Sequence, residues 1–300
     1  MLMIDKPSII VTSIGRTGTK FFADLFANII PDATSLHEPD ILNFSLKKGK
    51  GIKYLKKQLQ DADLRNLILK KSLGKWSLVG ISDKLFCNEI NADTAARLLF
   101  KQRHNFIESR KGKYYIESNV GYYGLLDVLP KTFKNHKAVY IIRDGRDWVA
   151  SNMKWGEMYG KGKLRSILAH NWPEAKDIAN DEYYYNWSHL TRFEKLCWAW
   201  SRLNKYAINK INQNPNAMGI RFEDIFLAEE KYYNFKQLLE FLSEMPGKGK
   251  INYNNFDGWL NNKIHSSNGY YPDWNDWTKE QKIFFENVCG PIMKEVGYKL

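Results

Sequence analysis

The stretch from Ile9 to Phe26, IIVTSIGRTGTKFFADLF, constrains the fold more than any other part of the chain. It begins with β-forming residues, passes through two glycines and continues with apolar residues at helical spacing. A strand, a glycine loop and a helix in this order form a site for a phosphate-like anion, because backbone N–H groups converge at the helix N-terminus. The sequence therefore predicts an anion site in this loop.

The side chains of the loop suit an anion as well as its backbone does. Gly15 and Gly18 allow close backbone approach to a ligand. Arg16 and Lys20 supply positive charge, and Thr17 and Thr19 supply hydroxyl donors.

The loop departs from the motif that binds nucleoside triphosphates. That motif has a glycine, four residues and then Gly-Lys-Ser/Thr. Counting from Gly15, the second glycine would fall where Lys20 stands, and Phe21 follows it. The loop of this chain therefore lacks the hydroxyl that would bind magnesium. Taken alone, the stretch also fits an ordinary strand-to-helix turn.

A second strand-to-helix segment lies far along the chain, in AVYIIRDGRDWVAS. Arg143 follows five β-forming residues, and Ser151 lies eight residues later, in a helix expected to have Asp147 in its first turn. Arg143 can bind an anion through two hydrogen bonds, and the Ser151 hydroxyl can donate a third. Alone, the segment is equally compatible with a salt-bridged turn.

Composition limits the class of protein and its compartment. The 300 residues include 45 Lys or Arg and 33 Asp or Glu, a net charge of +12 that favours anionic ligands. The three cysteines form no CxxC pair, which favours reduced thiols in the cytoplasm and no metal site. The N-terminus has no signal peptide pattern, and no apolar run is long enough to span a membrane.

Strand and helix patterns alternate along the whole chain. We expect strands at Ser8–Thr12, Thr34–Pro39, Ser77–Ile81, Lys113–Ser118, Ala138–Ile142 and Ala217–Phe222. We expect helices after Lys20, over Lys47–Lys75, Ala92–Ser109, Tyr122–Leu129, after Asp147, and over Thr191–Asn212, Ala228–Leu242 and Lys279–Val296. This predicts one α/β domain over residues 1–300, with three α/β/α layers and a mainly parallel sheet. An aromatic segment at about 155–192 interrupts the alternation and is expected to form a substrate-side wall or an ordinary packed pair of helices.

The candidate general base lies after the second expected strand, in His37-Glu38-Pro39. Ligands of open α/β sheets bind at the carboxyl ends of the strands, so Glu38 is our first choice. His37, Lys84 and His104 remain open as alternatives, and Glu38 is also compatible with a surface position before a turn.

Together these segments resemble the sulfotransferases that use 3′-phosphoadenosine 5′-phosphosulfate (PAPS). The loop Gly15-Arg16-Thr17-Gly18-Thr19 resembles the R/K-[ST]-G-T form of that family. The spacing of Arg143 and Ser151, the strand and acidic pair in GIRFEDI, and a basic glycine loop with a closing Gly-Tyr helix between Lys263 and Tyr298 also match. The resemblance covers most of the chain, except about Trp155 to Arg192.

The resemblance implies a P-loop-like sulfotransferase fold and a role for each matching residue. Arg16 to Lys20 would hold the 5′-phosphosulfate, with Arg16 as the catalytic cation and Glu38 as the base. Arg143 and Ser151 would hold the 3′-phosphate, with Lys263 and His265 adding to that contact, although the family usually has an Arg there. No metal ion is implied.

The acceptor would be a small molecule or a glycan, and the aromatic segment favours a carbohydrate hydroxyl or amine. The oligomeric state is open. Two other functions fit parts of the pattern: a small-molecule kinase with a P-loop-type site, and a non-catalytic nucleic-acid-binding protein. The loop spacing disfavours the kinase, and the dispersed lysines disfavour nucleic-acid binding.

Overall fold

The computed structural model describes residues 2–40, 62, 77–156, 158–160, 172–246, 249–261 and 270–300. Its centre is a sheet of five parallel strands in the order β2-β3-β1-β4-β5. The strands are β1 (Ser8–Thr12), β2 (Ala33–His37), β3 (Tyr114–Ser118), β4 (His136–Ile142) and β5 (Ala217–Arg221). A short antiparallel pair, β6 (Glu244–Met245) and β7 (Gly249–Lys250), lies apart from this sheet.

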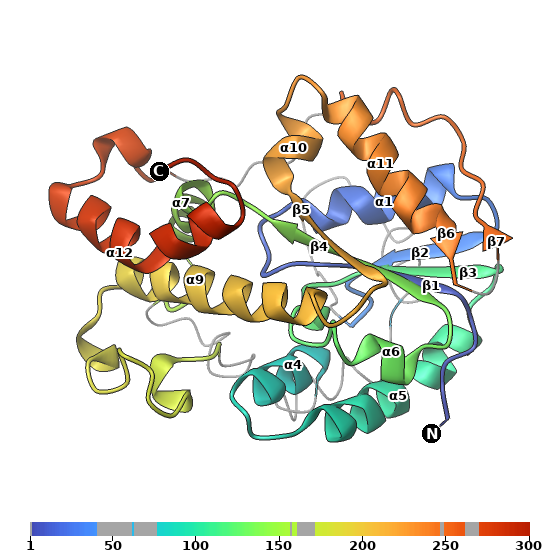
Figure 1. The fold of residues 1–300 in the computed structure, drawn as a ribbon, viewed down its shortest axis with the longest axis horizontal. Helices are drawn as coiled ribbons and strands as arrows, with labels where there is room; N and C mark the ends of the chain where they lie inside the picture. Colours follow the sequence, from blue (N-terminus) through green and yellow to red (C-terminus); the bar gives the residue numbers. More distant parts are fainter. Residues whose placement is uncertain are drawn as a thin grey trace, which may run out of the picture.

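Helices cover both faces of the sheet (Figure 1). One face carries α1 (Thr19–Ile29), α10 (Phe222–Phe226) and α11 (Lys231–Ser243), and the other carries α4 (Leu78–Phe86), α5 (Ala92–Glu108), α6 (Leu129–Thr132) and α9 (Arg192–Ile211). Next to α9 lie α7 (Gly145–Trp155) and α12 (Lys279–Glu295). Short 3₁₀ turns are η2 (Val120–Tyr122), η3 (Ala175–Asp177), η4 (Trp187–His189) and η5 (Trp274–Asp276). The predicted α/β class with a parallel sheet is confirmed.

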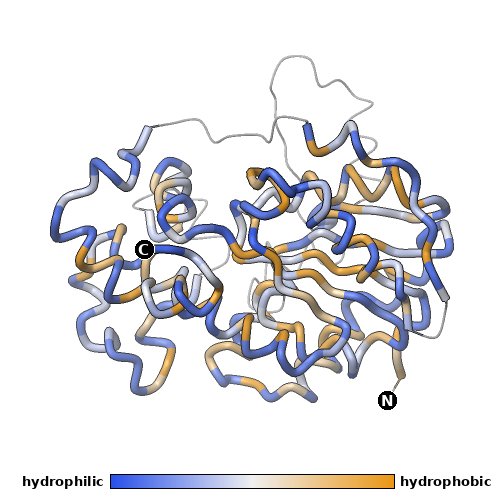
Figure 2. The backbone as a smooth tube through the Cα atoms, turned by 45° about the horizontal axis from the view of Figure 1, so that its top comes forward, coloured by the Kyte–Doolittle hydropathy of each residue, from blue (hydrophilic) through white to orange (hydrophobic). Residues whose placement is uncertain are grey.

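The alternation of side chains along the strands explains the two hydrophobic layers. Ile9 and Val11 of β1 pack with α1 and α11 on one face, while Ile10 packs with α4 and α9 on the other. A strand buried on both faces has to be apolar at successive positions, as parallel strands usually are. Figure 2 shows the strands as apolar segments within a more polar outer shell.

Two sequence expectations about secondary structure are wrong. Ser77–Ile81 was expected to be a strand, but it begins α4, because the Ser77 hydroxyl accepts a hydrogen bond from the Gly80 N–H (3.2 Å) and caps the helix. A short apolar run cannot distinguish a buried strand from a buried helix. Tyr122–Leu129 was expected to be a helix that Pro130 closes. Instead α6 begins at Leu129, with Pro130 in its first turn, where proline is favoured.

The other described elements agree with the expected positions to within a few residues. The helix expected over Lys47–Lys75 lies outside the described residues, apart from Ala62.

Gly145, the first residue of α7, has little room for a side chain. An added Cβ would lie 3.0 Å from Phe285 Cζ and 3.1 Å from the Trp200 ring, and both of these side chains are fully buried. We expect Gly145→Ala to lower the free energy of unfolding by about 1–3 kcal/mol, more than the ~0.5–1 kcal/mol that alanine gains over glycine in a helix. Urea unfolding measures this.

Gly258→Ala is the control, because an added Cβ there would meet nothing within 4 Å. Equal stability of the two variants would contradict the packing argument.

Candidate active site

The glycine loop between β1 and α1 has the backbone of an anion-binding loop. Gly15, Arg16 and Gly18 have φ angles of 86°, 60° and 76°, in the left-handed region. Ser13 Oγ accepts hydrogen bonds from the Gly15 N–H (2.9 Å) and the Thr17 hydroxyl (2.6 Å), which fixes the curvature of the loop. The N-cap of α1, Gly18, makes no side-chain capping bond, and the first turn of α1 has no acidic residue. The positive end of this helix is therefore not offset by the helix's own side chains.

The second predicted segment meets this loop directly. Strand β4 lies beside β1, so the turn that follows β4 comes next to the turn that follows β1. Arg143 donates from Nη1 to the carbonyl oxygen of Arg16 (3.0 Å), and Trp148 donates from Nε1 to the carbonyl oxygen of Gly15 (2.9 Å). Two segments about 130 residues apart thus form one site.

Arg143 carries a buried donor that has no partner among the described residues. Its Nε is buried and donates to no acceptor in the described part of the chain, although the side chain as a whole is 23% exposed. The guanidinium lies 5.0 Å above the Phe222 ring and 3.8 Å from the Asp147 carboxylate. A buried N–H without an acceptor is costly, so this geometry suits an external anion.

Arg16 and Ser151 contact each other. Arg16 donates from Nε to Ser151 Oγ (3.1 Å), and its guanidinium lies 5.6 Å above the Trp155 ring. Trp148, Ser151 and Trp155 are three and four residues apart on α7, so they share the helix face that meets the loop. The sequence analysis missed both tryptophans as site residues, although this spacing could have revealed them.

The remaining loop residues take different positions. Thr17 and Thr19 are buried, whereas Lys20 is exposed at the start of α1. Lys263 and His265 lie outside the described residues.

The four candidate bases separate into two groups. His37 ends β2 with Nε2 3.3 Å from the Thr19 hydroxyl, and Glu38 follows it with a left-handed φ of 42°. Lys84 instead forms an ion pair with Glu89 beyond α4, and the His104 ring packs on Phe100 within α5. Of the four, His37 is therefore the one that contacts the glycine loop, and Glu38 is its neighbour in the chain.

Burial keeps His37 neutral. Desolvation, aided by the charge of Lys20, lowers its pKa from 6.5 to about 4, although Asp40 opposes the shift. The unfolded chain therefore binds a proton on this ring between pH 6.5 and 4 that the folded chain does not bind. We expect the His37 contribution to stability to be complete above pH 6.5 and to be lost as the pH falls toward 4. Urea unfolding of wild type and His37→Gln across this range measures it.

His136→Gln provides the control, because burial lowers the pKa of His136 to about 4 as well and it lies at the start of β4. Each variant should show a weaker pH dependence than wild type. A His37→Gln protein with the wild-type slope would show that this histidine is not kept neutral by the fold.

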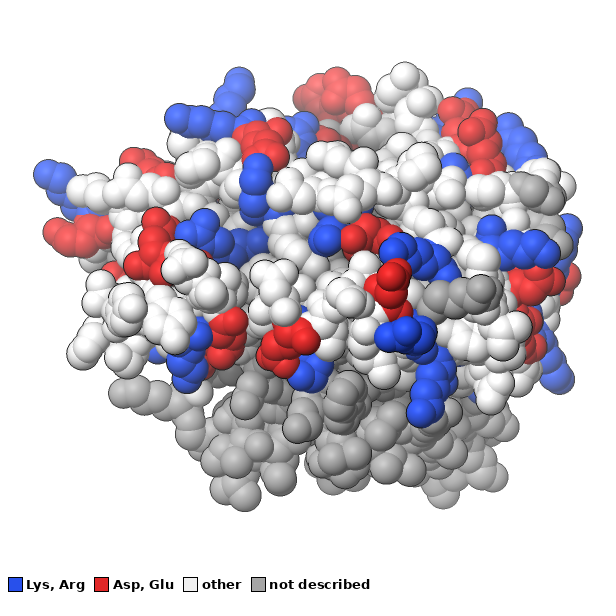
Figure 3. Space-filling model, turned by 60° about the horizontal axis from the view of Figure 1, so that its bottom comes forward, with Lys and Arg blue, Asp and Glu red and all other residues white. Residues whose placement is uncertain are grey.

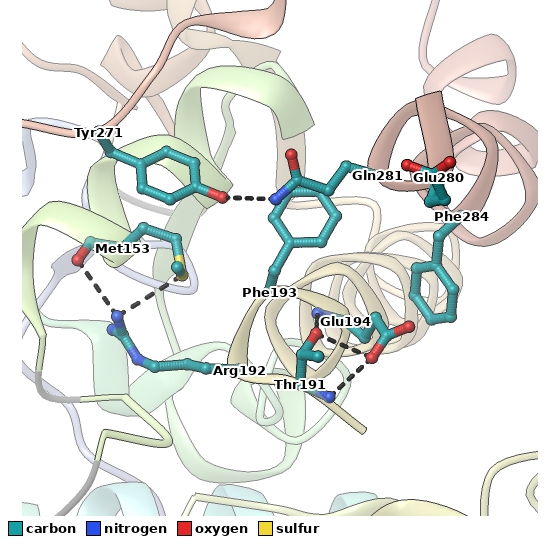
Figure 4. Close-up of a pocket in the computed structure, with 9 residues that line it drawn as sticks. All are labelled: Met153, Thr191, Arg192, Phe193, Glu194, Tyr271, Glu280, Gln281 and Phe284. Atoms are coloured by element: carbon teal, nitrogen blue, oxygen red, sulfur yellow. Dashed lines mark hydrogen bonds between the residues drawn. The ribbon is translucent and has the colours of Figure 1, made fainter. Parts of the chain in front are cut away.

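A pocket of about 440 Å³ lies beyond the site, between the last turn of α7 and the N-termini of α9 and α12 (Figure 4). Arg192 in its wall donates to the carbonyl oxygens of Asn152 (2.6 Å), Met153 (3.1 Å) and Met158 (2.9 Å). Arg192 thereby fixes the C-terminal end of α7. Of the predicted site residues that the structure describes, none lines this pocket.

The described aromatic residues of the 155–192 segment do not form one surface. Trp155 reaches Arg16, whereas Trp187 is 4% exposed and packs 4.9 Å from the Trp198 ring. Tyr184 and Tyr185 are exposed. A substrate wall in this segment stays a prediction.

Solved structures identify the fold. The sulfotransferase STF9 from Mycobacterium avium is similar over the whole of this chain and 79% of its own, with a TM-score of 0.54 and 11% sequence identity. The chain has the sulfotransferase fold. The sulfotransferase domain from the curacin biosynthetic pathway (TM-score 0.44, 14% identity, all of both chains) and a sulfotransferase from Alicyclobacillus acidocaldarius (0.41, 13%, 98% of this chain and 97% of that one) are also similar. No protein-family model and no curated protein sequence matches the chain.

Neither a membrane-spanning helix nor a metal-binding group is found in the described part of the chain. No helix there is both long and apolar enough to cross a membrane. No group of three or more His, Cys, Asp or Glu side chains within those residues is placed to hold a metal ion.

Proposed function

We propose that this protein is a PAPS-dependent sulfotransferase that transfers a sulfuryl group to a hydroxyl or amine of a small molecule or glycan. The observation that carries the proposal is the buried Arg143 Nε, which has no acceptor among the described residues, while Arg143 Nη1 holds the glycine loop. A ligand with two anionic groups, one at this guanidinium and one at the N-terminus of α1, would satisfy both. The fold supports the same activity class by analogy.

The residues fit the two anionic ends of PAPS. The loop from Gly15 to Lys20 would hold the 5′-phosphosulfate, and Arg143 with Ser151 would hold the 3′-phosphate. Bound PAPS would supply an activated sulfuryl group. The role of Arg16 would be to stabilise the negative charge that grows on the oxygen bridging the sulfur and the nucleotide phosphate.

The acceptor oxygen or nitrogen would form a bond to sulfur while the bond from sulfur to the bridging oxygen of the nucleotide phosphate breaks. Glu38 would take the proton from the acceptor, which leaves 3′-phosphoadenosine 5′-phosphate (PAP) and the sulfated product. Trp155 borders Arg16, so an aromatic side chain lies beside the proposed transfer point. This placement favours a sugar face or another flat acceptor.

Charge on the described face in Figure 3 does not favour a nucleic acid as the partner. Residues 41–76 contain ten Lys or Arg and two Asp, which is a net +8 of the total +12. On the face that Figure 3 shows, acidic and basic side chains of the described residues are interspersed rather than gathered in a basic groove. A nucleic-acid-binding surface usually gathers basic side chains in one stripe or patch.

The test is calorimetric titration without magnesium, with PAP, adenosine 5′-phosphate and ATP as ligands. We expect PAP to bind and adenosine 5′-phosphate to bind much more weakly, because only PAP has a 3′-phosphate. Preference for ATP, or binding that needs magnesium, would instead indicate a kinase. Salt-sensitive binding of oligonucleotides without PAP binding would indicate a nucleic-acid-binding protein.

Glu38→Gln tests the proposed base. We expect it to lower the rate of PAPS conversion to PAP, with water as the acceptor, by about 10²–10⁴-fold, because the amide cannot take a proton. PAP affinity should stay near the wild-type value. His37→Gln is the matched comparison, and the larger loss of rate identifies which of the two neighbours accepts the proton.

A further inference from the structure

A buried network of polar side chains includes Asp40, two residues beyond the proposed base. Arg103 of α5 and Glu117 of β3 are both fully buried, and Asp40 and Asn119 are each 1% exposed. None of these residues was selected from the sequence. Buried charges are costly unless they are paired and hydrogen-bonded. The position of this network in the fold therefore calls for a structural or functional explanation.

Glu117 is the centre of the network. Its carboxylate accepts hydrogen bonds from Arg103 Nη2 (2.8 Å), Asn119 Nδ2 (2.8 Å) and the hydroxyls of Tyr115 (2.7 Å) and Tyr122 (3.1 Å). These donors lie on β3, on α5 and in the turn after β3. The Glu117 carboxylate is therefore held rigidly at the carboxyl end of β3.

Asn119 connects Glu117 by hydrogen bonds to the segment that carries the proposed base. The same Nδ2 that donates to Glu117 also donates to Asp40 Oδ1 (2.8 Å), and Asn119 Oδ1 accepts from the Gly121 N–H (2.9 Å). Arg103 Nη2 lies 3.8 Å from Asp40 Oδ2. Asp40 is two residues beyond Glu38, so the network holds the far side of the His37–Asp40 segment.

The near side of the same segment is held by the sheet. His37 pairs with Ser118 in the parallel register of β2 and β3, and the Glu38 N–H donates to the Ser118 carbonyl oxygen (3.0 Å). Between these two attachments Glu38 has a φ of 42°, which is unfavourable for a residue with a side chain. Such a conformation persists only where its surroundings enforce it, and it often marks a functional site.

We propose that Asp40, held by Asn119, Glu117 and Arg103, is a positioning residue that keeps Glu38 in its left-handed conformation beside the glycine loop. This inference rests on the proposed function for its catalytic consequence, but not for its structural one. Without the Asp40 anchor, the backbone at Glu38 would relax toward negative φ and its carboxylate would move. A displacement of about 1 Å in a reacting group can cost roughly 10²-fold in rate.

The test compares Asp40→Leu with Asp40→Asn. Leucine has a similar size and cannot accept from Asn119, whereas the side-chain oxygen of asparagine can. We expect Asp40→Leu to increase amide hydrogen exchange at Glu38 by about tenfold or more and to slow PAPS conversion to PAP by about tenfold or more, with PAP affinity unchanged. Asp40→Asn should restore both exchange and rate toward wild type.

Asn204→Leu controls for a general loss of stability. Asn204 is also 1% exposed and hydrogen-bonded, to Tyr140 and to the carbonyl oxygen of Trp200, away from this segment. It should leave exchange at Glu38 and the rate unchanged. If Asp40→Leu does not fold, Asp40→Ser replaces it, because serine is too short to reach Asn119.

Four outcomes would overturn the proposal: unchanged exchange at Glu38 in Asp40→Leu, an unchanged rate, a loss of PAP affinity as large as the loss of rate, or equal effects in Asn204→Leu. Failure of the proposed function looks different. Wild type would then not bind PAP, while the exchange measurement would still decide whether Asp40 fixes the Glu38 backbone.

Discussion

Arg16→Ala is expected to lower the conversion of PAPS to PAP by about 10²–10³-fold or more, while PAP binds with nearly wild-type affinity. Arg16 lies in the glycine loop at the N-terminus of α1, where charge on the leaving oxygen would develop. A donor that acts mainly on the transition state changes the rate more than the ground-state affinity. Calorimetry with PAP and a rate measurement with PAPS separate the two effects.

Arg16→Lys is the control for charge. Lysine keeps the positive charge but has no Nε–H with which to hold Ser151, so it should retain part of the rate. If Arg16→Ala converts PAPS at the wild-type rate, Arg16 is not the catalytic cation.

Arg143→Ala is expected to weaken PAP binding by about 1.5–3 kcal/mol, the usual scale for a hydrogen bond to a charged group. Calorimetry should show this loss for PAP and a much smaller one for adenosine 5′-phosphate, because the proposed contact is with the 3′-phosphate.

Arg146→Ala is the matched control for Arg143→Ala. Both side chains are 23% exposed and both belong to the same turn, but the Arg146 guanidinium is already bound by Asp144 through Nε (3.0 Å) and Nη2 (2.5 Å). Its removal should leave PAP affinity unchanged. If Arg143→Ala binds PAP as tightly as wild type, the assignment of the 3′-phosphate site is wrong.

Local sequence was sufficient where one short segment decides the structure. The glycine loop, the turn at Arg143 and the capped helix that begins after Thr191 were all located because their turn residues, caps and apolar spacing act within a few positions. Local sequence gave the wrong element for Ser77–Ile81, where a helix cap on Ser77 outweighed the β-forming residues. It was also wrong for Tyr122–Leu129, where Pro130 lies in the first turn of a helix instead of ending one.

The sequence by itself determined the parallel α/β class and most of the residues that form the candidate site. Only the tertiary structure decided which candidate base meets the glycine loop, because His37 at the end of β2 contacts Thr19 and Glu38 follows it, while Lys84 and His104 belong to α4 and α5. It also decided the contact between Arg16 and Ser151 and the network that joins Asp40 to Arg103. The Arg16–Ser151 and Asp40–Asn119 contacts join residues 135 and 79 positions apart, and they follow from strand order and register, which no local pattern encodes.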